Sequence, residues 1–175
     1  MGTDEERILA DGTALMSEER WREAIDLFHS AAHYVASNWE IAWNAGWAYY
    51  KVEDYQNAVE TLRRSTELAP DNASAWWALG TVQEEANDLE AAEINLRRAL
   101  TLKDSSLARQ SLALVLMKQK RWSEAETVHT EGIELQPKSA SRWKSYGAFL
   151  SDMGRREEAL SAYRRYRALR VTSSG

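Results

Sequence analysis

The sequence contains no cysteine, and this absence excludes several kinds of chemistry. Disulfides, zinc–thiolate sites and thiol nucleophiles all require a cysteine sulfur. A chain without disulfides also fits a reducing compartment, so we expect a cytoplasmic protein. Proline occurs twice and glycine eight times in 175 residues. Because few residues can break a helix, long helices are expected and a many-stranded sheet is not.

Long apolar runs are also missing. No stretch approaches the ~20 apolar residues that cross a bilayer, and the first residues, MGTDEER, lack the basic and apolar order of a secretion signal. We therefore expect no membrane partner. The apolar share of 44% and the charged share of 28% are typical of a globular chain. The length suits one domain spanning residues 1–175.

Catalytic motifs are absent as well. The sequence has no glycine-rich phosphate loop, no nucleophile elbow and no paired metal-binding motif. His29 and His33 stand four residues apart and could share a helix face, but a metal site needs a third ligand and none is evident. We expect no enzyme activity, no cofactor and no metal.

Charge is distributed unevenly along the chain. The net charge is −5, yet residues 1–104 carry 20 acidic and nine basic residues, whereas residues 105–175 carry seven acidic and 13 basic ones. The chain therefore has an acidic front and a basic end. A negative net charge disfavours nucleic acid as a partner.

The strongest positive signal is an internal repeat. Small or apolar residues recur in columns with steps of 34, 34, 33 and 34 residues. Repetition at this period predicts five copies of one helical unit. The columns are Gly12, Gly46, Gly80, Ala113 and Gly147; Ala24, Ala58, Ala92, Ala125 and Ala159; and Phe28, Leu62, Leu96, His129 and Tyr163.

Each unit is expected to hold two helices. Apolar spacing of three and four residues predicts a helix before Asp54 and another after it, with Asp54 as the cap of the second. Pro70 ends the unit. The small columns allow the paired helices to approach closely, so a large residue at Gly46 would strain the packing. The single step of 33 predicts one residue fewer in the turn near Lys103–Ser105.

These columns resemble the tetratricopeptide repeat family, through WWALG at 76–80 and NAVETLRRSTELAP at 57–70. The resemblance implies an all-α, right-handed α-solenoid of five helix-turn-helix repeats, in which the first helix of each pair lines a concave groove. The expected repeats are 5–37, 38–71, 72–104, 105–138 and 139–170. Three residues depart from the family pattern: Ala113, His129 and Tyr166.

The helix around residue 46 carries more aromatic rings than its own core row needs. Trp43, Trp47 and Tyr50 share one face, offset by one residue, or about 100° of helix rotation, from the row of Gly46. In the implied solenoid this second face lines the groove, where clustered aromatic residues are typical anchors of a protein interface. The predicted partner-binding residues are Trp43, Asn44, Trp47, Tyr50, Lys51, Trp77, Leu114 and Met117.

A second interpretation is that these rings pack between repeats and bind no ligand. Other tryptophans are expected to be structural in any case. Trp76 and Trp143 occupy the family's tryptophan column and are expected in the core, while Trp21 and Trp122 begin second helices.

The main hypothesis is a non-enzymatic scaffold that binds a protein or peptide in the groove. The positions at which some family members hold a chaperone C-terminus with basic residues do not fit here; they are Glu6, Ala10, Glu40, Asn44, Ser74 and Ala78, of which only Asn44 matches. Two alternatives stay open. The acidic N-terminal half could meet the basic C-terminal repeat of another copy and give a homo-oligomer, or the chain could be the targeting arm of a larger enzyme.

Overall fold

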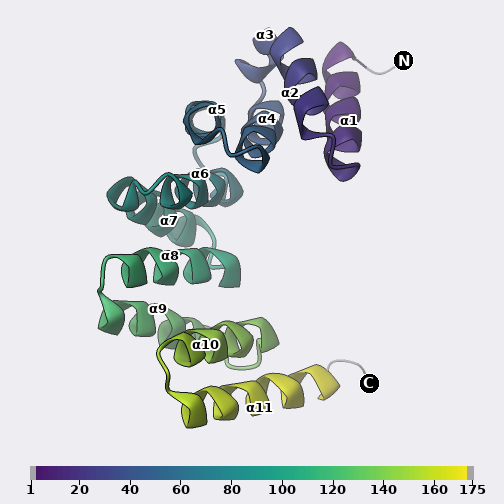
Figure 1. Cartoon of the computed structure of the whole chain (residues 1–175). Helices are drawn as coiled ribbons and strands as arrows, with labels where there is room; N and C mark the ends of the chain where they lie inside the picture. Colours follow the sequence, from purple (N-terminus) through teal and green to yellow (C-terminus); the bar gives the residue numbers. More distant parts are fainter. Residues whose placement is uncertain (1–2, 173–175) are drawn as a thin grey trace. The chain divides into compact units, whose positions relative to one another are not determined.

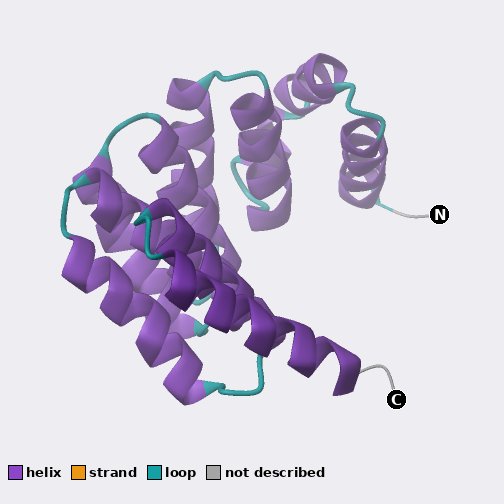
Figure 2. Ribbon diagram, turned by 60° about the horizontal axis from the view of Figure 1, so that its bottom comes forward, coloured by secondary structure: helices purple, strands orange, loops and turns teal. Residues whose placement is uncertain are grey.

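The computed structural model describes residues 3–172, and all regular structure in that range is helical (Figures 1 and 2). The expectation of an all-α protein is confirmed. Contacts between residues divide the chain into two compact units, one ending at Leu102 and the other starting at Lys103. A single domain over residues 1–175 stays a prediction.

The first unit holds three helix pairs and one short extra helix. Within each pair the chain runs up one helix and back along the next (Figure 1). The helices are α1 (Asp4–Ser17), α2 (Trp21–Ser30), α3 (Ala32–Val35), α4 (Trp39–Lys51), α5 (Tyr55–Leu68), α6 (Ala73–Glu85) and α7 (Leu89–Leu102).

The second unit holds two further pairs of the same kind. Its helices are α8 (Ser106–Lys118), α9 (Trp122–Leu135), α10 (Ala140–Asp152) and α11 (Arg156–Thr172).

Short polar side chains fix where many of these helices begin. The Oδ1 atom of Asp54 accepts a hydrogen bond from the amide of Asn57 at 3.2 Å, as expected for the cap of α5. Asn72 caps α6 by accepting from the amides of Ser74 and Ala75. Such caps satisfy amides that have no partner within the helix.

The turn inside each pair repeats the same backbone conformation. One residue of each turn has a positive φ between 59° and 73°, and these residues follow the spacing of the sequence columns. The left-handed conformation reverses the chain between the two helices. The five residues are Glu19, Glu53, Asn87, Lys120 and Gly154.

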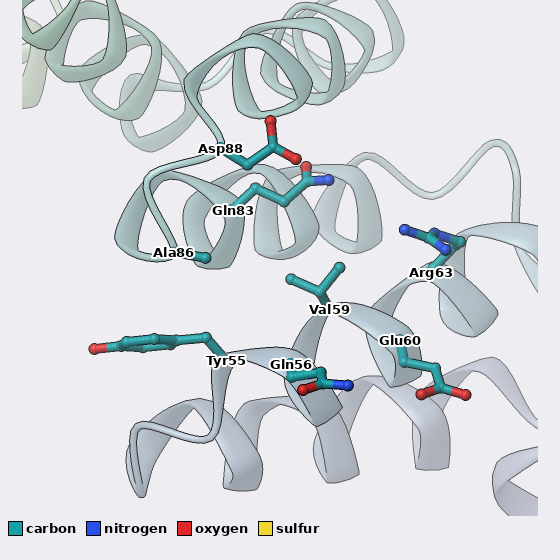
Figure 3. Close-up of a pocket in the computed structure, with 8 residues that line it drawn as sticks. All are labelled: Tyr55, Gln56, Val59, Glu60, Arg63, Gln83, Ala86 and Asp88. Carbon is teal, nitrogen blue, oxygen red and sulfur yellow. The ribbon is translucent and has the colours of Figure 1, made fainter.

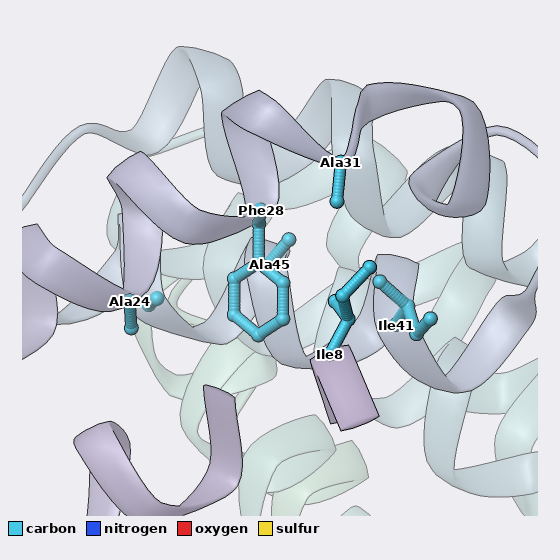
Figure 4. Packing of buried hydrophobic residues seen from close by; sticks show 7 residues of the cluster. Ile8, Ala24, Phe28, Ala31, Ile41 and Ala45 are labelled. Carbon is cyan, nitrogen blue, oxygen red and sulfur yellow. The ribbon is translucent and has the colours of Figure 1, made fainter. Parts of the chain in front are cut away.

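The paired helices approach closely at the glycine column, as predicted. A Cβ atom built on Gly46 would lie 2.6 Å from Cγ of Leu62, and one on Gly80 would lie 2.7 Å from Cγ of Leu96. In the first pair the ring of Phe28 occupies this space beside Gly12 and packs in the cluster of Figure 4. The small column is therefore a requirement of packing.

The turn between α7 and α8 is one residue shorter than the turns that join α5 to α6 and α9 to α10, as the sequence predicts. Four residues separate α5 from α6 and α9 from α10, whereas three, 103–105, separate α7 from α8. The predicted deletion is confirmed. One feature was not expected: the second helix of the first repeat breaks at Ala31 (φ −106°, ψ 29°) and continues as α3.

Candidate functional site

Four aromatic rings form a continuous cluster in the first unit, which we call the aromatic surface. Trp43, Trp47 and Tyr50 lie on α4 and Trp77 lies on α6. Trp47 is central, because its ring centroid lies 5.7 Å from that of Trp43, 5.7 Å from that of Trp77 and 4.9 Å from that of Tyr50. The planes of Trp43 and Trp47 differ by only 4°, so these two rings are stacked.

All four rings of the aromatic surface are partly buried. They pack against a core formed by Ala58, Leu62, Ala78, Leu79 and Val82, and each keeps part of its area in contact with solvent. The rings therefore stabilise the contact between neighbouring repeats and also leave an aromatic patch in contact with solvent. Partial burial of the rings is therefore compatible with both interpretations of the sequence, packing between repeats and contact with a ligand.

The indole nitrogen of Trp43 has an unusual environment. Its Nε1 atom is buried and has no hydrogen-bond partner among the described residues. A buried donor without an acceptor costs roughly 1–3 kcal/mol. The position of Trp43 is thus set by ring packing and not by a hydrogen bond.

Asn44 and Lys51 are held by contacts within the unit. Asn44 is only 6% exposed, and its Nδ2 atom donates to the carbonyl of Glu40 at 2.8 Å. The Lys51 ammonium is exposed and lies 5.7 Å from the ring centroid of Trp21 and 5.8 Å from that of Tyr50. It thereby places a positive charge at one end of the aromatic surface.

Acidic residues border the same end. Burial raises the pKa of the Tyr50 hydroxyl above its ordinary value, and the nearby carboxylates of Glu85 and Glu84 raise it further. Tyr50 is consequently a neutral hydrogen-bonding group at physiological pH.

The remaining predicted residues, Leu114 and Met117, belong to the second unit. Both project from α8 into a notch of about 230 Å³ whose other walls come from α9 and α10. Leu114 is 43% exposed. The structure therefore brings six of the predicted residues together in the first unit and places these two in a notch of the second.

A larger cleft of about 510 Å³ in the first unit was not predicted (Figure 3). It lies between α5, which contributes Tyr55 and Val59, and the end of α6, which contributes Gln83. Glu60, Arg63 and Asp88 also line it, so both signs of charge are present. Its residues do not share a repeat column, which is why the periodicity did not reveal it.

Two tryptophans expected in the core have a different role. Trp76 and Trp143 are only partly buried, and their Nε1 atoms donate to the carbonyls of Pro70 at 2.8 Å and Pro137 at 2.9 Å. Each ring therefore fixes the turn that precedes its own helix. Trp122, expected to be structural, is 43% exposed.

The short turn uses a different arrangement, which the sequence did not reveal. Asp104 accepts a hydrogen bond at 2.6 Å from Nε of Arg109 and another at 2.6 Å from Nη2 of Arg142. Arg109 stands at the repeat position that Trp76 and Trp143 occupy in their units. Burial raises the pKa of Asp104, but the hydrogen bonds from the two arginines outweigh it and hold that pKa below its ordinary value.

Within residues 3–172, no three His, Asp or Glu side chains gather in a way that could hold a metal ion. His29 and His33 are both exposed. In the same range, no helix has the length and apolar character needed to span a membrane.

Comparison with known proteins identifies a repeat family in part of the chain. The sequence model of the tetratricopeptide repeat matches residues 44–106. This match confirms the resemblance to the tetratricopeptide repeat family for these residues. The heat shock protein sti1 homolog of Schizosaccharomyces pombe is 32% identical over 87 residues, which are 50% of this chain and 15% of that protein. Superkiller protein 3 of the same yeast is 26% identical over 137 residues, which are 73% of this chain and 10% of that protein. The chain thus spans only a small part of the curated relatives it matches.

Solved structures confirm the fold class. A crystal structure of MamA protein superposes with a TM-score of 0.75 at 20% identity, covering 99% of this chain and 96% of the other. A MamA fragment from Desulfovibrio magneticus RS-1 gives 0.74 at 16% identity, covering 100% of this chain and 99% of the other. At these identities the likeness establishes the fold alone. The predicted α-solenoid of five helix-turn-helix repeats is confirmed.

Proposed function

We propose that this tetratricopeptide repeat protein binds a peptide segment of a partner protein on the aromatic surface. The observation that carries the proposal is the joining of four half-buried rings, centred on Trp47, into one patch. Aromatic rings that are already packed on one side lose little conformational entropy when a ligand covers the other.

The proposed ligand is an apolar segment with an aromatic or aliphatic anchor. Burying one large apolar side chain against the rings contributes roughly 1.5–3 kcal/mol. At the Tyr50 end the exposed side chains of Lys51 and Glu85 offer one charge of each sign, so Lys51 can attract an acidic residue of the segment and Glu85 a basic one. Asn44 donates one N–H of its Nδ2 group to its own helix, so only the second N–H and the Oδ1 atom can bind the ligand.

The sequence does not favour a C-terminal carboxylate as the ligand. The matching groove positions in the second repeat are Glu40 and Asn44, and a glutamate there repels a carboxylate. The partner that we propose is therefore recognised through its apolar side chains.

A random peptide library displayed on phage tests the proposal. Peptides selected on the wild-type chain should lose about tenfold in affinity for Trp47→Leu, which keeps an apolar contact with the core but removes the central ring. Trp122→Leu removes an exposed tryptophan of the other unit and should bind as the wild type does. Urea unfolding of both variants checks that each is folded during the affinity measurement.

Equal affinity for Trp47→Leu and the wild type would refute the aromatic surface as the binding site. The same conclusion follows if Trp122→Leu loses as much affinity as Trp47→Leu.

Self-association is a second candidate, favoured by unpaired charge on α11. Arg164, Arg165 and Arg167 are exposed, and no ion pair involves them within residues 3–172. These cations suit the acidic N-terminal half of another copy. Sedimentation velocity should then show dimers or larger species at 20 mM salt that dissociate at 500 mM salt, where charge attraction is screened over roughly 4–5 Å. A monomer under both conditions would contradict it.

A further inference from the structure

The notch of the second unit differs from the corresponding places in other repeats because of one side chain. His129 lies on α9, in the column that Phe28, Leu62 and Leu96 fill elsewhere, and it lines the notch. It is only 6% exposed. In this repeat alone the facing small residue is Ala113, which lines the same notch.

The imidazole of His129 is buried but not used by the fold. Its ring contacts are aromatic, with centroids 5.1 Å from Phe149 and 6.0 Å from Tyr146. Within residues 3–172 it makes no hydrogen bond, and neither of its ring nitrogens is sealed from the surface. The hydroxyl of Tyr146 does not serve it, because this group is hydrogen-bonded to Oε1 of Glu126 at 2.8 Å.

The imidazole is neutral at physiological pH. Burial lowers the pKa of His129 to about 4, and the positive charge of Arg109 also acts to lower it. A neutral imidazole offers one donor and one acceptor, and which nitrogen carries the proton is set by its partners.

The walls of the notch select against charged ligands. Leu114, Met117 and Phe149 make its sides apolar. Near the imidazole the positive charge of Arg109 outweighs the negative charge of Glu126 and disfavours a cation, while Asp152 at the notch disfavours an anion. The remaining choice is a neutral, mainly apolar side chain with one polar group at its tip.

We propose that the notch takes a tyrosine side chain of the bound partner segment, with its hydroxyl hydrogen-bonded to His129. This inference rests on the proposed function, since the tyrosine belongs to the same class of peptide ligand. A hydroxyl can donate or accept, so it satisfies either tautomer of the imidazole, whereas an indole N–H can only donate. A volume of about 230 Å³ is enough for one phenol ring.

Histidine nitrogen NMR tests the notch without knowledge of the partner. The chain has three histidines, so a long-range ¹H–¹⁵N spectrum of the labelled protein resolves His129 from His29 and His33, which serve as internal references. The probes are N-acetyltyrosinamide, N-acetylphenylalaninamide and N-acetyltryptophanamide, titrated at pH 7.5. The tyrosine probe should shift only the His129 signals and bind about fivefold more tightly than the phenylalanine probe, as expected for one net hydrogen bond.

His129→Leu provides the matched variant. Leucine is the residue of this column in the second and third repeats, so the packing is preserved while both nitrogens are lost. In this variant, backbone amide shifts around Leu114 should report equal affinity for the tyrosine and phenylalanine probes.

The inference would be overturned by equal binding of the tyrosine and phenylalanine probes to the wild type, by shifts confined to His29 or His33, or by a tyrosine preference that survives in His129→Leu. A wild-type preference for the tryptophan probe would overturn it as well. These outcomes do not test the proposed function. That function is tested by the affinity of selected peptides for the Trp47→Leu variant, whose substitution lies in the first unit.

Discussion

Replacing Asp104 by asparagine should destabilise the protein far more than a surface change does. The carboxylate of Asp104 is the shared acceptor of two arginines whose side chains are largely withdrawn from water, Arg109 with 11% and Arg142 with 3% of its side-chain area exposed. Arg142 already has one buried N–H, on Nη1, without an acceptor among the described residues. Removal of the carboxylate leaves both cations without their main counter-charge.

The magnitude follows from this burial. Breaking a buried ion pair by removing one partner costs roughly 3–5 kcal/mol, and Asp104 keeps 25% of its side-chain area exposed. The lower end, about 3 kcal/mol, is therefore expected for Asp104→Asn. For a chain of this length this loss corresponds to a decrease in melting temperature of roughly 6–12 °C.

Asp71→Asn is the matched control. Asp71 lies in the preceding turn between pairs, is 92% exposed and stands 3.9 Å from Nη2 of Arg98, a geometry whose contribution is about 0–1 kcal/mol. Urea unfolding followed by far-ultraviolet circular dichroism at pH 7 measures both variants. Equal losses of unfolding free energy for the two variants would refute the assigned role of Asp104.

Three further predictions concern single residues. Gly80→Ala should lower the unfolding free energy by about 1–3 kcal/mol, because its Cβ would meet Leu96 at 2.7 Å; helix propensity alone predicts a gain of about 1 kcal/mol, and a measured gain would show that the helices can separate freely. Because the pKa of His129 is lowered to about 4 in the folded chain, from about 6.5 unfolded, its contribution to stability is complete above pH 6.5 and is lost as the pH falls towards 4. Urea unfolding should show that the free energy of unfolding is about 2 kcal/mol lower at pH 5 than at pH 7.5, and His129→Leu should abolish this difference. The same difference in the variant would contradict a buried neutral imidazole. The pKa of Asp104 is below its ordinary value, so the contribution of Asp104 to stability persists down to about pH 4 and is lost at lower pH. Asp104→Asn should therefore be less stable at neutral pH, and its unfolding free energy should depend less on pH below about pH 4.

The repeat architecture could be predicted because it depends on periodic packing. Glycine faces a large side chain on the paired helix in four of the five repeats, and this requirement leaves a column of small residues in the sequence. The same logic located the short turn at 103–105 from a single step of 33. Periodicity also identified Trp43, Trp47 and Tyr50 as a second face of one helix.

Features that depend on exceptions to the repeat could not be predicted in this way. Arg109 replaces a tryptophan of the repeat, but nothing in the local sequence indicates that Arg142, from another helix, meets it at Asp104. Asn44 lies at a groove position, yet its amide is turned back to its own helix. The break before α3 depends on one backbone conformation at Ala31, which no pattern of apolar residues specifies.

The degree of burial of individual side chains could not be predicted from the sequence either. Trp76 and Trp143 match the core column of the family, but their nitrogens need acceptors and find them at the surface, on the carbonyls of Pro70 and Pro137. His129 appeared only as a departure from an aromatic column. Its importance follows from the notch that it lines and not from its position in the repeat.

The most direct test of the account is hydroxyl-radical footprinting of the protein with and without a peptide selected from the library. The method compares the oxidation of every tryptophan and tyrosine in one experiment and needs no variant. Binding on the aromatic surface predicts protection of Trp43, Trp47, Tyr50 and Trp77, with the oxidation of Trp122 unchanged. Protection of Trp122 with unchanged oxidation of the four rings would contradict it.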